Sequence, residues 1–153
     1  MREIDKIVKD ILTNYGFVFK KSSWYRVSDD FIQIINFQKS QFSNKFYINF
    51  GLDERDSQGL IYKNEYQFPI RLRADMMVLG EQLMAALDFE VPCSETIRNE
   101  NLQAIITNIV NFLDSINGWE QLRSAMHNKT HLIHKAFITG PFINKINNTF
   151  GSL

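Results

Sequence analysis

Two strand-like runs joined by a short polar connection lie between Phe31 and Leu52, and this pattern constrains the fold more than any other. In the second run every second residue is apolar, at Phe46, Ile48, Phe50 and Leu52. Such a period of two is typical of a strand that buries one face. The first run is apolar on both faces at its start and becomes polar on one side through Asn36, Gln38 and Ser40. Because turn-forming residues separate the runs, they predict an antiparallel hairpin within a sheet.

Helical periodicity marks both sides of this strand-rich region. Apolar residues recur at helical spacing from Ile4 to Tyr15, opposite a charged side, and predict a first helix. A longer apolar stripe follows Ser94, a predicted N-cap, and stops at Asn117-Gly118. Shorter helices are predicted to begin near Asp75, Trp119 and Pro141.

The order of these elements favours an α+β fold. Further strand patterns begin at Phe17, Trp24 and Phe68, and the last contains Pro69, which suits an edge strand. Since strands are grouped early and helices late, we expect a small antiparallel sheet of about four strands, with an N-terminal helix and C-terminal helices packed on one face. We expect residues 1–153 to form a single α+β domain with a C-terminal extension from about residue 136.

The composition disfavours several classes of protein. Seventeen Lys and Arg residues balance seventeen Asp and Glu residues, so no net charge draws the chain to nucleic acid or to an anionic membrane. The N-terminus lacks the pattern of a signal peptide, and no apolar run has the length of a membrane span. Cys93, the single cysteine, cannot form an internal disulfide. We therefore expect a cytoplasmic protein that makes no membrane contact, and the neutral net charge disfavours nucleic acid as its partner.

Several short motifs in the first half of the chain occur together in one order. They are Tyr15-Gly16-Phe17, Lys20-Lys21, Trp24-Tyr25-Arg26, the run from Ile34 to Ser40 and the run from Phe46 to Gly51. In this combination the chain resembles the bacterial family catalogued as domain of unknown function 4304. The resemblance implies an α+β domain, and it brings no assigned activity and no catalytic residues.

The predicted sheet has one face that helices do not cover. If Phe46, Ile48 and Phe50 face the helices, the opposite face is expected to carry Trp24, Arg26, Asn36, Gln38, Tyr47, Asn49, Arg71 and Arg73. Trp, Tyr and Arg are enriched in interface hot spots, so one interpretation is a binding surface. The other is an ordinary solvated sheet face with cross-strand polar pairs. Our preferred hypothesis is a binding module that docks a protein partner through this face.

Two other functions are consistent with the residues. The histidines at His127, His131 and His134 would share one face of a continuous helix and could hold a transition metal, in a metal-binding protein or an enzyme. No carboxylate or cysteine lies near them in the sequence. Single-stranded nucleic acid could instead stack on Trp24 and Tyr47. No phosphate loop, nucleophile elbow or zinc-ribbon spacing is present, so we expect no catalytic residues and no cofactor.

Overall fold

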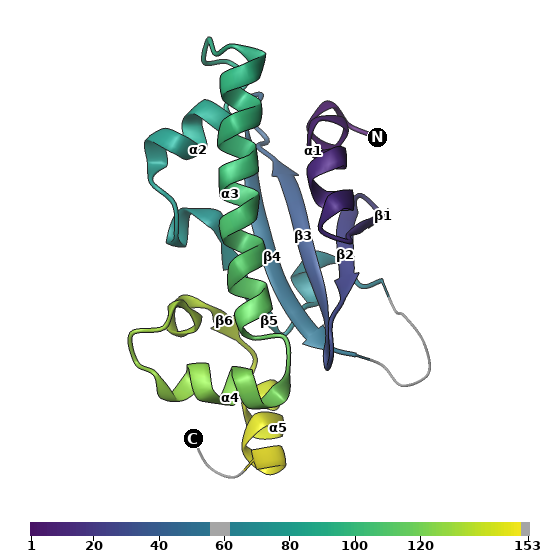
Figure 1. Ribbon diagram of the computed structural model, residues 1–153, viewed down its shortest axis with the longest axis vertical. Helices are drawn as coiled ribbons and strands as arrows, with labels where there is room; N and C mark the ends of the chain where they lie inside the picture. Colours follow the sequence, from purple (N-terminus) through teal and green to yellow (C-terminus); the bar gives the residue numbers. More distant parts are fainter. Residues whose placement is uncertain (56–61, 151–153) are drawn as a thin grey trace.

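The computed structural model describes residues 1–55 and 62–150, and these form one antiparallel sheet with helices packed against it (Figure 1). The strands follow one another across the sheet in sequence order. They are β1 (Val18–Lys20), β2 (Ser23–Val27), β3 (Phe31–Lys39), β4 (Phe46–Glu54), β5 (Ile70–Arg73) and β6 (Phe137–Ile138). The described residues also form five α-helices: α1 (Glu3–Asn14), α2 (Gly80–Leu87), α3 (Glu95–Ser115), α4 (Trp119–His127) and α5 (Gly140–Phe150).

The α+β prediction is confirmed, but the sheet has six strands rather than about four. The strand pattern at Phe17 corresponds to the short edge strand β1, whereas no pattern predicted β6 at the other edge. β6 has only two residues, too few for a period of two to be visible in the sequence. β6 lies far along the chain and joins the sheet only because it pairs with β5, Ile70 opposite Ile138.

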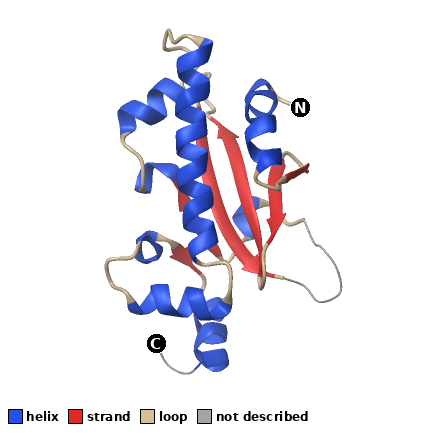
Figure 2. Cartoon of the chain, in the orientation of Figure 1, coloured by secondary structure: helices blue, strands red, loops and turns tan. Residues whose placement is uncertain are grey.

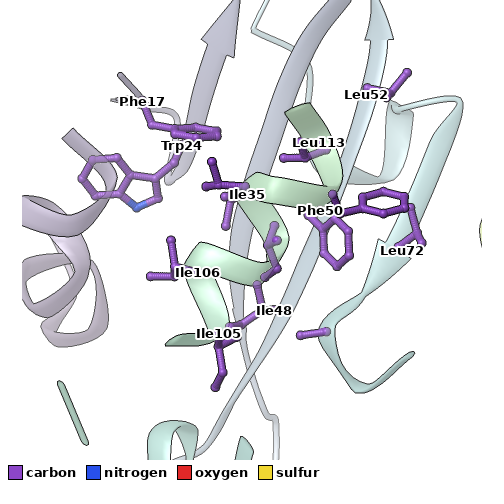
Figure 3. Packing of buried hydrophobic residues seen from close by; sticks show 14 of the residues in the cluster. Phe17, Trp24, Ile35, Ile48, Phe50, Leu52, Leu72, Ile105, Ile106 and Leu113 are labelled. Atoms are coloured by element: carbon purple, nitrogen blue, oxygen red, sulfur yellow. The ribbon is translucent and has the colours of Figure 1, made fainter. Parts of the chain in front are cut away.

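The long helix α3 runs along the sheet and supplies the centre of the core (Figures 1 and 2). The Ser94 hydroxyl accepts a hydrogen bond from the Ile97 amide, 3.2 Å away, so the predicted N-cap is confirmed. The buried side chains of α3 include Leu102, Ile105, Ile106, Ile109, Val110 and Leu113. They pack against the apolar face of the hairpin (Figure 3), as its alternation predicted.

The region after residue 136 packs on its own chain. Phe142 and Ile146 of α5 are buried in the main core. The Phe142 ring stacks on Trp119 of α4, with 5.4 Å between ring centroids. Lys145 of α5 also forms an ion pair with Glu54 at the end of β4.

A second, smaller core lies on the other face of the sheet. It contains Tyr25, Ile32 and Ile34 from the strands, with Phe68 and the partly buried Tyr62. The last two residues flank a 3₁₀ turn, η1 (Glu65–Gln67), that leads into β5. The second face is therefore only half open, and the open part is polar.

The second helix begins later in the chain than the sequence predicts. The second helix was predicted to begin at Asp75, but residues Ala74–Met76 form a 3₁₀ turn, η2, and α2 begins at Gly80. In the described residues no helix combines the length and the apolar composition needed to cross a membrane.

Candidate functional site

Six of the eight residues predicted for the open face lie on it. Asn36 is paired with Asn49, Gln38 with Tyr47, and Asn49 with Arg73. Neighbours that alternate with them along the strands, such as Ile48 and Leu72, belong to the main core on the opposite face. The same alternation places Asn36, Gln38, Tyr47, Asn49, Arg71 and Arg73 together on the second face.

The prediction that Trp24 lies on the open face is wrong. Trp24 pairs with Ile35, so its side chain lies on the helix-covered side (Figure 3). Only 1% of it is exposed, and its indole Nε1 donates a hydrogen bond to the buried Asp5 of α1, 3.2 Å away. The proposed stacking platform for nucleic acid therefore loses one of its two aromatic rings.

The prediction for Arg26 is wrong for the same reason. Its guanidinium reaches toward α3 and forms an ion pair with Asp114, with 2.5 Å between Nη2 and Oδ1. Nε donates to the Gln33 side chain at 2.8 Å, and the Phe17 ring lies 4.7 Å from the guanidinium carbon. Arg26 thus ties strands β2 and β3 to α3, and it is not available to a partner.

The three amide side chains of the open face are largely occupied with other protein groups. Asn49 is 5% exposed and donates a 2.9 Å hydrogen bond to the Gln38 side chain. Asn36 donates to the Ser23 hydroxyl, also at 2.9 Å. Such cross-strand pairs satisfy the polar groups of a sheet surface, so these residues fit the interpretation as an ordinary sheet face.

A different group of residues on this face has no such explanation. The basic–aromatic cluster, as we call it, consists of Lys45, Tyr47, Arg71, Arg73 and Phe137. The Arg73 guanidinium lies 4.7 Å and the Lys45 ammonium 5.2 Å from the centre of the Tyr47 ring. The Arg71 guanidinium lies 4.4 Å from the centre of the Phe137 ring. These are cation–π distances, and they hold the three cations near the strand surface.

Phe137 could not have been assigned to this face from the sequence. Its position depends on the pairing of β6 with β5, which sets Phe137 opposite Arg71. The side chain is 54% exposed although it is large and apolar. An exposed aromatic ring beside an arginine matches the composition of interface cores rather than that of an average surface.

The cations of the cluster are poorly neutralised. In the part of the chain that the structure describes, no carboxylate lies within 4 Å of the charged nitrogens of Lys45, Arg71 or Arg73. The buried Nε of Arg71 has no hydrogen-bond acceptor among the described residues. Burial raises the pKa of the nearby Glu65, and Arg71 and Arg73 only partly oppose this shift. The cluster can therefore accept a negative group from outside the chain.

The three histidines do not share a helical face. α4 ends at His127, and the chain turns at Asn128 before the short 3₁₀ helix η3 (Leu132–Lys135). The condition for a shared face, a continuous helix, is not met, because Asn128 and Thr130 form a turn through their side chains. His131 caps η3 instead, with Nδ1 accepting from the Ile133 amide at 3.0 Å.

The surroundings of these histidines give no metal-binding geometry. Burial and the neighbouring His134 both lower the pKa of His131, burial being the larger cause. No group of three or more His, Cys, Asp or Glu side chains within residues 1–55 and 62–150 is arranged to hold a metal ion.

Comparison with known proteins identifies one family. The family model described as "Domain of unknown function (DUF4304)" matches residues 8–124. The resemblance predicted from the motifs is thereby confirmed, and the match extends past the hairpin through α3 into α4. It includes Lys45, Tyr47, Arg71 and Arg73, whereas Phe137 and all three histidines lie outside it. No curated protein and no solved structure matches the chain.

Proposed function

The chain belongs to the DUF4304 family, and we propose that it is a binding module that docks a protein partner through the basic–aromatic cluster. The observation that carries this proposal is the set of cations held against aromatic rings on an open sheet face, none of them in a close ion pair with a described carboxylate. The surface it would recognise on a partner is acidic, because three neighbouring cations favour negative groups as partners.

The chemistry of the cluster supports an interface role. Tyr supplies a large contact area with few rotatable bonds, and Arg supplies several hydrogen-bond donors. Both residue types are therefore enriched in interface hot spots. The buried Nε of Arg71 lacks an acceptor, and an unsatisfied buried donor costs about 1–3 kcal/mol. A partner carboxylate beside the Arg71 guanidinium would offset part of this cost through its charge, so binding would be favoured at this residue.

The remainder of the second face limits where the partner can dock. The half near Tyr25, Ile32 and Ile34 is covered by Tyr62 and Phe68. The open half lies over the first part of β4 and over β5 and β6, where the cluster is found. The contact would therefore centre on Tyr47 and Arg71.

We also propose the cytoplasm as the location. Cys93 is free, as expected for a protein kept in a reducing compartment.

Charge reversal at the cluster tests the proposal. We would express tagged Arg71→Glu and Arg73→Glu variants in the native host and compare their co-purifying proteins with those of the wild type. Lys9→Glu is the matched control, since Lys9 is an exposed cation on α1. We expect the wild type and the control to retain a partner that both cluster variants lose, with unchanged unfolding temperatures. Retention of every partner by both cluster variants would contradict the proposal.

A further inference from the structure

One edge of β4 is left without a strand partner over part of its length. β5 pairs with β4 only from Asn49, opposite Arg73, to Leu52. If that register continued, Ala74–Met76 would lie opposite Phe46–Ile48. These residues instead form η2, where the amides of Met77 and Val78 both donate to the Ala74 carbonyl. Among the described residues, the Phe46–Ile48 edge therefore has no neighbouring strand on this side.

The unpaired edge is bounded at both ends. β5 ends at Arg73, and an isolated bridge joins Lys45 to Asp88 just after α2. The gap between these two points is three residues long, roughly 10 Å of strand. It has the length of a short extended peptide.

A pocket of about 190 Å³ lies at this gap. β4 and η2 form one side of it, and α2 forms the other with Leu83, Met84 and Leu87. An apolar cavity of roughly 150 Å³ is known to hold one benzene ring, so this pocket has room for one large side chain and not for a nucleotide-sized cofactor.

The rim of the pocket carries both apolar and basic groups. Met84, which lines the pocket, is 54% exposed. Lys45 and Arg73, two cations of the basic–aromatic cluster, also line the pocket. Two acids, Asp75 and Asp88, line it as well, and Asp88 accepts a hydrogen bond from the Glu90 amide. An occupant that combines an apolar side chain with a carboxylate would complement this rim.

We propose that the partner contributes an extended segment that pairs with β4 along Phe46–Ile48. This part of the β4 edge lies beyond Arg73, where the pairing with β5 ends. One large apolar side chain of this segment enters the pocket beside α2, and an adjacent Asp or Glu meets Lys45 and Arg73. Main-chain hydrogen bonds to an open strand edge supply affinity in this binding mode, and the pocket supplies specificity. This inference rests on the proposed function and names the part of the partner that is recognised.

Selection from a random peptide library tests the inference even while the partner is unidentified. We would select linear heptapeptides displayed on phage against the wild-type protein and remove those that also bind Met84→Glu. We expect the enriched peptides to share one large apolar residue next to Asp or Glu. Failure to enrich such peptides, or an enriched motif without the apolar residue, would overturn the inference.

Binding by the enriched peptides then tests the geometry. Met84→Glu should lower the affinity for the enriched peptides by about tenfold or more, because a charge would enter the apolar pocket. Ile97→Glu, a matched change of a 51% exposed residue on α3, should leave affinity unchanged. Methylation of the peptide backbone nitrogens, one at a time, should weaken binding by about tenfold at one or more positions, because a main-chain hydrogen bond is lost. Equal affinity of all methylated peptides would rule out strand addition.

The outcomes separate this inference from the proposed function. If Arg71→Glu loses the native partner while Met84→Glu retains it, the docking proposal stands and the strand addition is wrong. If both variants retain the partner, both are wrong. A protein that selects no peptide but binds 4-phenylbutyrate, with amide shifts at Ile48 and Leu83 in NMR spectra, would show a small-molecule site instead.

Discussion

Gly51 of β4 lies directly against the backbone of Ile70 in β5: a Cβ atom built on residue 51 would lie 2.0 Å from the Ile70 carbonyl oxygen. The neighbouring atom belongs to the backbone, so it cannot move away as a flexible side chain could. Gly51 therefore allows the two strands to approach each other beside the basic–aromatic cluster.

We expect Gly51→Ala to lower the free energy of unfolding by about 1–3 kcal/mol, because β5 must shift to accommodate one methyl group. Urea denaturation followed by circular dichroism measures this change. Gly80→Ala is the matched control, since no atom lies within 4 Å of its added Cβ and alanine favours helix. Equal stability of the two variants would contradict the close approach of β4 and β5.

The buried carboxylate of Asp5 joins α1 to the sheet. It forms an ion pair with Arg2, with 2.7 Å between Nε and Oδ2, and it accepts the hydrogen bond from Trp24. We expect Asp5→Ala to destabilise the protein by about 1–3 kcal/mol, because the buried indole N–H loses its acceptor. Asp10→Ala, on the exposed side of the same helix, should change stability by less than about 0.5 kcal/mol. A tryptophan fluorescence melt distinguishes the two.

The lowered pKa of His131 predicts a pH dependence of stability. Its folded-state pKa lies below the ordinary value of 6.5, so the unfolded chain binds the proton more readily. The contribution of neutral His131 is therefore complete above about pH 6.5 and is lost as the pH falls toward the folded-state pKa. The variant His131→Asn keeps an acceptor for the Ile133 amide. We expect its melting temperature to fall less than that of the wild type between about pH 7 and pH 5. An unchanged pH profile in this variant would contradict the assignment.

The sequence patterns predicted the elements whose residues carry a clear period. The alternation of Phe46, Ile48 and Phe50 correctly indicated the covered face of the sheet, and Ser94 correctly marked the start of α3. These signals are local, so each can be interpreted without reference to the tertiary structure.

The errors arose where the deciding information is not local. Trp24 and Tyr25 are adjacent and both buried, in the two cores on opposite faces, so β2 shows no alternation that would reveal which side Trp24 occupies. The register with β3 decides it, and that register becomes visible only in three dimensions. Phe137 and the pocket beside α2 could not be predicted for the same reason, since both depend on where short segments end and pair.

The central claim is that a partner docks on the open sheet face at Tyr47. The most direct test replaces Tyr47 with the photocrosslinking residue benzoylphenylalanine in native host cells, and Ile97 in a parallel strain as the control. After irradiation, mass spectrometry of the purified protein identifies any attached peptide. We expect position 47 to yield one reproducible crosslinked protein, through an acidic segment, and position 97 to yield none. Absence of a crosslink at position 47, or the same crosslinks at both positions, would contradict the claim.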